Sequence, residues 1–212
     1  MKNDEKTIKL VLNDENKIKE FFKNNEEEIK RIVIKDCKIE KINLYNIDFS
    51  NIEIEDSDLQ ECKLDKAYFK DCKFTNCNFS NSNFEKVSFR RCKFDNCKLV
   101  GCLFLDSRLY DINFKDTNGN FSNFTTSILE NIFFENSSFR NAYFQEDKLK
   151  KIQFNNIDFT QTQFLRTKLK DIDFSKSIIS GITSYVDDLK GAIINEMQAI
   201  ELIGLLGVKI AD

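Results

Sequence analysis

The segment from Cys72 to Cys102, CKFTNCNFSNSNFEKVSFRRCKFDNCKLVGC, decides the fold because its cysteines and phenylalanines recur at every fifth residue. This spacing matches neither the two-residue period of a β-strand nor the 3.6-residue period of an α-helix. One position of the repeat is held by Phe74, Phe79, Phe84, Phe89 and Phe94. A second position, two residues earlier, is held by Cys72, Cys77, Cys92 and Cys97. The segment is therefore built from units of five residues.

The same register extends over most of the chain. A large apolar residue stands at every fifth position from Ile34 to Ile194, and only Gly119 and Ser184 interrupt the series. All seven cysteines lie two residues before a position of this series, where Ser, Ala and Thr are otherwise common. Asn, Asp and Gly are frequent two residues after it, and these residues tolerate the positive φ of a tight turn. The pattern indicates a large inward residue, a small inward residue and a corner.

Such a unit predicts one short extended side and one corner, so that four units close a square coil. Stacked coils would pair backbone to backbone at about 4.8 Å, as neighbouring strands do. Residues one coil apart would then lie directly above one another, with Phe74 over Phe94 over Phe114. The phenylalanines and cysteines of the Cys72–Cys102 segment are accordingly predicted to form the structural core.

The units CNFSN, SNFEK, CKFDN and SSFRN resemble those of the pentapeptide repeat proteins, whose unit is written A(D/N)LXX. The resemblance covers about residues 34–194 and implies an all-β fold, the right-handed quadrilateral parallel β-helix. In length and layout the chain is most similar to the quinolone-resistance (Qnr-type) members. These bind the type II topoisomerases DNA gyrase and topoisomerase IV.

Three parts are expected along the chain: an N-terminal cap with a short helix over residues 1–32, a β-helix of about eight coils over residues 33–194, and a C-terminal capping and dimerisation helix with a short strand over residues 195–212. Asn13 or Asp14 can begin the first helix. Asn195 can cap the second helix together with Gln198, and Gly207 can end it. Val208 and Ile210 are predicted to form the short strand.

The C-terminal helix is apolar on more than one face. One face can close the rod, and a second face suggests a partner subunit. The Qnr-type resemblance likewise implies that this helix joins two subunits. The candidate dimer interface consists of Met197, Ile200, Leu202, Ile203 and Leu206.

One stretch leaves a structural question open. In DTNGNFSN, Gly119 replaces the large apolar residue and Phe121 should point outward. Some Qnr-type proteins carry projecting loops, and residues 117–123 are the best candidate for one here. The sequence does not decide whether they project.

The sequence offers no catalytic, metal-binding or cofactor-binding residues. His is absent, so no nucleophile–base pair can be assembled around one, and no Gly-rich phosphate loop is present. The cysteines follow the repeat and not the paired spacing of zinc sites, which favours small buried hydrophobes. Asp147 and Asp187 fall at inward positions, where a local distortion or a rim position is the favoured explanation. We expect no enzyme.

Composition limits the partners. The formal net charge is −3, from 32 basic and 35 acidic residues that are well mixed, which argues against direct nucleic-acid binding. No apolar run approaches the roughly 20 residues that cross a bilayer, and the N-terminus lacks the apolar core of a secretory signal. We expect a cytoplasmic protein with reduced thiols and no membrane partner.

The resemblance implies a non-enzymatic interaction protein that binds DNA gyrase or topoisomerase IV, with DNA mimicry as one mode. Such a protein would protect the topoisomerase from quinolones or a natural gyrase poison. The candidate partner-binding residues form an acidic cluster of Glu53, Glu55, Asp56, Asp58 and Glu61. The alternative is a rigid scaffold or binding module for another protein, since repeat rods present long surfaces.

Overall fold

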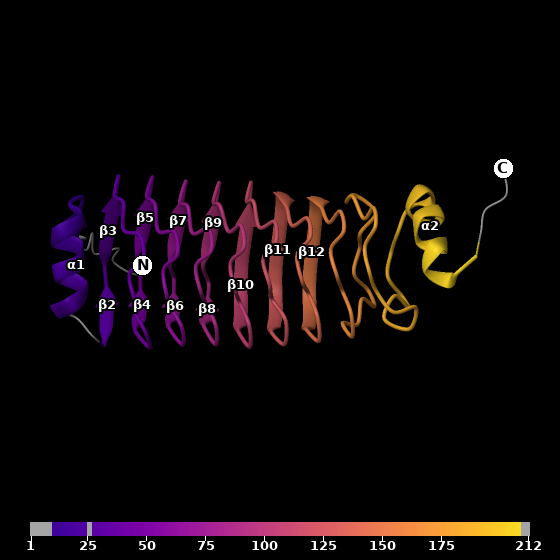
Figure 1. The fold of residues 1–212 in the computed structure, drawn as a ribbon, viewed down its shortest axis with the longest axis horizontal. Helices are drawn as coiled ribbons and strands as arrows, with labels where there is room; N and C mark the ends of the chain where they lie inside the picture. Colours follow the sequence, from indigo (N-terminus) through magenta and orange to yellow (C-terminus); the bar gives the residue numbers. More distant parts are fainter. Residues whose placement is uncertain (1–9, 25–26, 209–212) are drawn as a thin grey trace, which may run out of the picture.

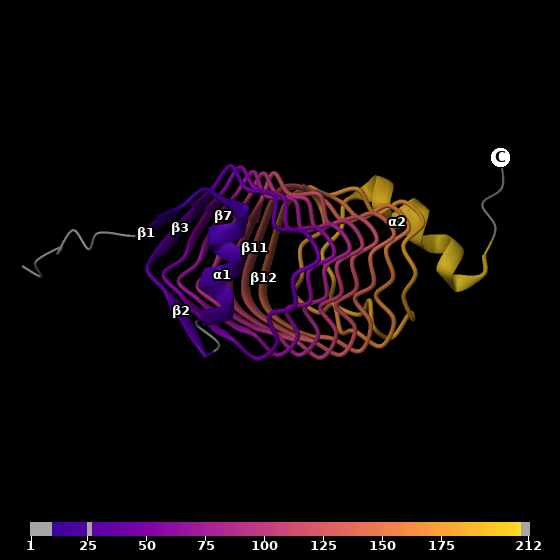
Figure 2. The same ribbon diagram turned by 60° about the vertical axis from the view of Figure 1, so that its left-hand side comes forward.

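The computed structural model describes residues 10–24 and 27–208, and these form a rod of stacked coils with one helix at each end (Figure 1). The coils make a parallel β-helix, so the predicted fold class is confirmed. Turned toward its N-terminal end, the rod shows coils with flat sides and sharp corners, with helix α1 lying across the opening (Figure 2).

The strands lie mainly on two adjacent sides of the rod. Their bounds are β1 Leu10–Leu12, β2 Glu28–Lys30, β3 Ile32–Lys35, β4 Asp48–Ser50, β5 Glu53–Glu55, β6 Tyr68–Lys70, β7 Lys73–Thr75, β8 Ser88–Arg90, β9 Lys93–Asp95, β10 Arg108–Lys115, β11 Ile128–Ser138 and β12 Lys148–Asp158. Every strand pair is parallel, and Phe74 pairs with Phe94 and Phe94 with Phe114. The other two sides are joined by isolated parallel bridges such as Asn78 to Lys98 and Leu103 to Asn123.

Stacked phenylalanines fill the interior. The ring centroids of Phe74 and Phe94 lie 4.8 Å apart, and those of Phe94 and Phe114 lie 5.1 Å apart, both in stacked geometry. The corners take up the left-handed conformation, with φ of 53° at Asn76 and 67° at Gly101. The predicted unit of inward residue and corner therefore describes the coil as it is built.

The small inward positions carry a repeated hydrogen-bond bridge. The Ser82 hydroxyl accepts from the Cys62 N–H at 3.0 Å and donates to the Leu59 carbonyl at 2.8 Å. Ser107 makes the same pair of bonds with Val87 and Phe84. Buried hydroxyls are thus satisfied by the backbone of the preceding coil.

All seven cysteines are buried and free. Burial raises the pKa of the Cys62 thiol to about 11 and also raises that of Cys102, so these sulfurs remain neutral and unreactive.

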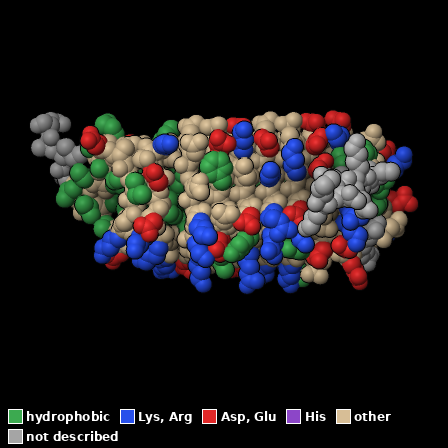
Figure 3. Space-filling view, turned by 180° about the vertical axis from the view of Figure 1, so that it is seen from behind, with side chains coloured by type: hydrophobic (Ala, Val, Ile, Leu, Met, Phe, Trp, Pro, Cys, Tyr) green, Lys and Arg blue, Asp and Glu red, His purple; other side chains and the backbone are tan. Residues whose placement is uncertain are grey.

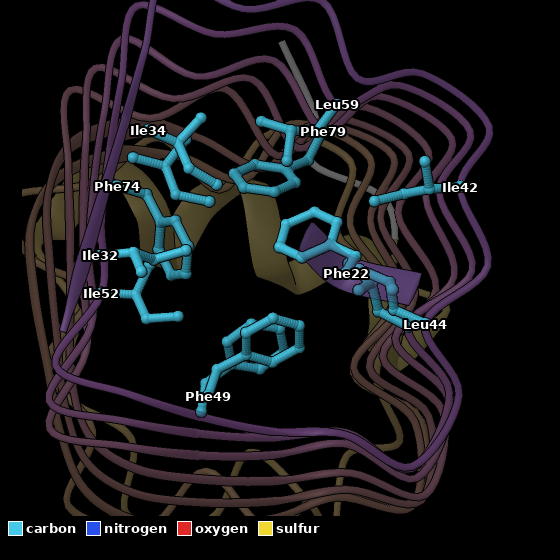
Figure 4. Close-up of a pocket in the computed structure, with 13 residues that line it drawn as sticks. Phe22, Ile32, Ile34, Ile42, Leu44, Phe49, Ile52, Leu59, Phe74 and Phe79 are labelled. Atoms are coloured by element: carbon cyan, nitrogen blue, oxygen red, sulfur yellow. The ribbon is translucent and has the colours of Figure 1, made fainter. Parts of the chain in front are cut away.

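Helix α1, Glu15–Asn24, closes the N-terminal end of the rod. The Asp14 carboxylate accepts from the Lys17 N–H at 2.9 Å and caps the helix, as predicted. Ile18 and Phe22 are buried, and Figure 4 shows Phe22 reaching into the interior above Phe49, 6.4 Å away between ring centroids. Strands β1 and β2 pair with β3 and β4, so the parallel ladder already includes residues of the segment assigned to the cap.

At the other end, helix α2 spans Glu196–Ile203 and continues into the 3₁₀ turn η1, Gly204–Leu206. Asn195 and Gln198 form the predicted capping box. Gln198 is buried, and its amide nitrogen donates to the carbonyls of Phe174 and Ser177 at 2.8 and 2.6 Å, which seals the last coil. The end of the predicted strand, Ile210, lies outside the described residues, and Val208 belongs to no strand.

Residues 117–123 do not project from the rod. Asn118 bridges to Lys98 and Ser138, and Asn123 bridges to Leu103 and Tyr143, so the coil passes straight through. Phe121 points outward with 56% of its surface exposed, as predicted. The place left by the missing side chain of Gly119 is taken by the ring of Phe139, because a Cβ on Gly119 would lie 2.2 Å from its Cε1.

The inward assignment of Asp187 is wrong. A turn after Tyr185, in which the N–H groups of Asp188 and Leu189 both donate to the Tyr185 carbonyl, shifts the chain by one residue. Asp187 is exposed, and Asp188 is buried instead, where it pairs with Lys168 at 2.8 Å. Of the two explanations offered by the sequence, a local distortion and a rim position, the turn is an instance of the first.

Candidate interaction surfaces

The acidic cluster lies on two adjacent sides of the first coils. Glu53 and Glu55 belong to β5, and Asp56 stands at the following corner with φ of 49°. Asp58 lies on the next side, and Glu61 stands at the corner after it with φ of 55°. The five side chains therefore wrap around an edge of the rod and do not form one flat patch.

Neighbouring coils supply partners for this cluster. Lys35 pairs with Glu55 at 2.5 Å, and Lys41 approaches Glu61 at 3.6 Å, in each case from the coil before. Asp56 accepts from the Asn76 amide at 2.7 Å. Because stacked lysines neutralise part of the charge, the structure offers little support for a continuous acidic surface like that of DNA.

Some basic residues are paired in the same manner. Arg91 donates to Asp71 through two nitrogens at 2.6 and 2.8 Å, and Lys150 pairs with Glu130 at 2.7 Å. The Lys150 ammonium lowers the pKa of the Glu130 carboxyl, as expected for an ion pair. These pairs neutralise part of the positive charge of the basic side chains.

A different side of the rod lacks charge altogether over five successive coils. We call it the uncharged face, defined as the outward residues of segments 101–105, 121–125, 141–145, 161–165 and 181–185. No Lys, Arg, Asp or Glu occurs in these segments, although 32% of the chain is charged. On the same side of the earlier coils, segments 41–45, 61–65 and 81–85 carry Lys41, Glu61, Lys63, Asp65 and Glu85.

Aromatic, aliphatic and amide side chains build the uncharged face. Leu103, Phe121, Tyr143 and Tyr185 are exposed by 38%, 56%, 36% and 51%. Bridges place Leu103, Asn123, Tyr143, Gln163 and Thr183 in one column. In the view from behind, backbone and uncharged side chains, with scattered hydrophobic ones, occupy much of the middle of the rod, while Lys and Arg gather along its lower edge (Figure 3).

This composition is typical of the centre of a protein–protein interface. Such centres are depleted of charged residues and enriched in aromatic ones, with polar and charged groups at the rim. Sequence reasoning missed the face because it searched for charge. Sorting the outward residues by coil would have revealed the face, since the absence of charged residues can be seen in the five-residue segments themselves.

The candidate dimer residues lie on and just after α2. Met197, Ile200 and Leu206 are exposed by 71%, 51% and 59%, whereas Leu202 and Ile203 are half-buried, with Leu202 packed against the core. Ile193, half exposed, precedes the helix. The structure therefore exposes Met197, Ile200 and Leu206 at this end and partly buries Leu202 and Ile203, and an interface through these residues stays a prediction.

Asp147 is buried at its inward position, and the coil is regular on either side of it, so the expectation of a local distortion or a rim position is wrong for this residue. Its Oδ1 accepts from the Ser127 N–H at 2.7 Å, while Oδ2 is buried and has no hydrogen-bond partner among residues 10–24 and 27–208. Burial raises the pKa of this carboxyl to about 9.

Within residues 10–24 and 27–208, no group of three or more Cys, Asp or Glu side chains could hold a metal ion. No helix in the same part of the chain is long and apolar enough to span a membrane. The grooves that line the corners are open and polar, for example the one bordered by Asn76, Asn96 and Asp116.

Comparison with known proteins agrees with the geometry. A family model described as "Pentapeptide repeat region" matches residues 67–144. No curated protein matches the chain.

Two solved structures share the fold. HetL, a pentapeptide repeat protein involved in heterocyst differentiation regulation from the cyanobacterium Nostoc sp. strain PCC 7120, is 14% identical with a TM-score of 0.61, over 87% of this chain and 98% of HetL. QnrB1, a plasmid-mediated fluoroquinolone resistance protein, is 16% identical with a TM-score of 0.51, over 87% of this chain and 100% of the other. At these identities the likeness extends to the fold alone, and the two proteins have different roles.

Proposed function

Because this chain carries a pentapeptide repeat region and the β-helix that such repeats form, we propose that it is a non-enzymatic interaction protein that presents a rigid side to a protein partner. The observation that carries this proposal is the uncharged face. A surface with four exposed apolar side chains and no charge over five coils has a cost in solubility unless a partner uses it.

The partner that we propose first is a type II topoisomerase, DNA gyrase or topoisomerase IV. Two considerations support it: the Qnr-type resemblance of the repeat and of the C-terminal helix, and the shared fold with a fluoroquinolone resistance protein. Binding would protect the enzyme from a quinolone or a natural gyrase poison. The neutralised acidic cluster favours contact through the uncharged face over mimicry of DNA.

Direct binding tests both the partner and the face. Purified gyrase is passed over the immobilised protein, and its affinity is compared for the unaltered protein and the variant Tyr143→Glu. This variant places a charge at the centre of the uncharged face. We expect at least a tenfold loss of affinity, because a buried unpaired charge is strongly unfavourable at an interface. Binding should weaken little with salt, since few ion pairs would form.

The matched control is Glu55→Lys, which reverses a charge in the acidic cluster. If Glu55→Lys abolishes binding and Tyr143→Glu does not, the acidic cluster of Glu53, Glu55, Asp56, Asp58 and Glu61 is the contact surface and the mode is DNA mimicry. If the unaltered protein does not bind gyrase, the topoisomerase assignment is wrong.

HetL favours the second candidate, a rigid scaffold or binding module for another protein, because the same fold there belongs to a regulator of differentiation. In this second candidate function the rod itself is the functional element, and its uncharged face would bind a partner other than a topoisomerase. Absence of gyrase binding combined with a specific complex formed by a different purified candidate would select it.

We also propose a homodimer through the exposed residues of α2 and η1. The change Ile200→Asp should convert the dimer to a monomer while leaving the thermal midpoint nearly unchanged, because Ile200 is half exposed and is not one of the buried core residues. Light scattering measures the mass. A mass that stays the same for both proteins, whether monomeric or dimeric, would contradict this interface.

A further inference from the structure

The column of small inward residues that contains Asp147 follows one hydrogen-bond rule. Each hydroxyl accepts from the N–H of the residue one coil earlier and donates to a carbonyl three residues before that. Ser127 receives the Ser107 N–H at 2.9 Å and donates to the Phe104 carbonyl at 2.6 Å. Thr167 receives the Asp147 N–H at 3.0 Å and donates to the Phe144 carbonyl at 2.8 Å.

Asp147 stands between Ser127 and Thr167 and satisfies the first half of this rule. Its Oδ1 accepts from the Ser127 N–H. The rule assigns its second oxygen to the Phe124 carbonyl, and that oxygen, Oδ2, is buried without a partner. An ionised carboxylate has no proton to donate, so Oδ2 and the Phe124 carbonyl oxygen, which are both acceptors, would have no hydrogen bond between them.

We propose that Asp147 is a neutral carboxylic acid whose Oδ2–H replaces the repeat hydroxyl and donates to the Phe124 carbonyl, so that the rod holds a proton as part of its core and loosens when that proton is lost. The Phe124 carbonyl already accepts from the Ser127 N–H at 3.1 Å and has a second lone pair available. The Phe84 carbonyl shows that such sharing fits, because it accepts from both Val87 N–H and the Ser107 hydroxyl.

In the part of the chain that the structure describes, no charged group compensates an ionised Asp147. Its chain neighbours Glu146 and Lys148 are exposed, and Glu146 pairs with Arg166 at 2.6 Å. In the coil after it, Arg166 and Lys168 flank Thr167 and point outward, and Lys168 pairs with Asp188. In the coil before it, Ser127 is flanked by the uncharged Thr126 and Ile128. The carboxyl therefore faces only neutral groups.

Desolvation agrees with this geometry. Burial raises the pKa of Asp147 to about 9, and the hydrogen bond from Ser127 lowers it by less. In the unfolded chain the carboxyl returns to the ordinary value of about 3.9. At any pH between these two pKa values, the folded protein therefore holds a proton on Asp147 that the unfolded chain has lost.

The sign of the pH dependence follows. The stabilisation that protonated Asp147 gives is fully present below the pKa that this carboxyl has in the unfolded chain. It is lost as the pH rises through the pKa that the carboxyl has in the folded protein. Between about pH 5 and pH 8, Asp147 should raise the unfolding equilibrium constant by roughly tenfold for each pH unit, the linkage expected for one proton.

The test compares the full chain with Asp147→Asn by denaturant unfolding at pH 5 and pH 8. An amide oxygen can accept from Ser127 while the amide nitrogen donates to Phe124, so Asn imitates the protonated acid. We expect the two proteins to have similar stability near pH 5, and the variant to become increasingly more stable toward pH 8. Equal pH dependence in both would overturn the proposal.

A second variant and a direct measurement keep the test decisive. Asp147→Ser restores the hydroxyl that Ser107 and Ser127 use in the same column, and it should also remove the pH dependence. Carboxyl ¹³C NMR of the unaltered protein should show Asp147 neutral at pH 7. An ionised Asp147 at pH 7 would contradict the proposal even if either variant failed to fold.

Discussion

Replacing Phe94 with alanine should lower the free energy of unfolding by about 3–5 kcal/mol, the usual loss for a buried phenylalanine. Phe94 is 1% exposed. Its ring stacks on Phe74 and Phe114 and meets the edge of Phe89 at 5.5 Å. Because the coils above and below fix these rings, the cavity cannot collapse, and we expect a value near the upper end. Denaturant unfolding measures it.

The control is the adjacent residue on the same strand, β9. Lys93 points outward and is exposed, so Lys93→Ala should change stability by less than about 0.5 kcal/mol. Similar shifts for the two variants would contradict the assignment of inward and outward positions.

The change Gly119→Leu restores the large residue that the repeat calls for, yet it should destabilise the rod by about 3 kcal/mol, the upper range for overpacking. The ring of Phe139 already occupies that space, at 2.2 Å from the position of a Cβ. Phe139 also contacts Phe114 and Phe134, at 6.0 and 5.1 Å between ring centroids, and has little room to move. Thermal and denaturant unfolding both report the loss.

A compensating change makes this prediction specific. Phe139→Leu should cost stability alone but recover much of it when combined with Gly119→Leu, because the two side chains share one space. Strict additivity of the two changes would show that Phe139 does not fill the place of residue 119.

The period of five predicted the coil because each unit is locally consistent, with an inward Phe, a small inward Cys or Ser and a corner that tolerates positive φ. The stacking of Phe74 on Phe94 follows from that period alone. The capping residues could also be predicted, because Asp14 and Asn195 stand directly before an amphipathic or apolar helix. Their side-chain oxygens accept from free N–H groups of the first turn.

Other features depend on contacts that a period does not contain. The turn after Tyr185 exchanges Asp187 for Asp188 through two hydrogen bonds that no repeat position encodes. The filling of the Gly119 position by Phe139 depends on a side chain in the next coil. The ion pair between Lys35 and Glu55 neutralises part of the acidic cluster. It can be recognised only when residues one coil apart are placed together.

The measurement that tests the central claim most directly is DNA supercoiling by purified gyrase, titrated with this protein in the presence and absence of ciprofloxacin. The account predicts that the unaltered protein and Glu55→Lys restore supercoiling in the presence of the drug, and that Tyr143→Glu does not. Supercoiling that stays inhibited at every concentration of the unaltered protein, although it folds as a β-helix, would contradict the proposed protection of gyrase.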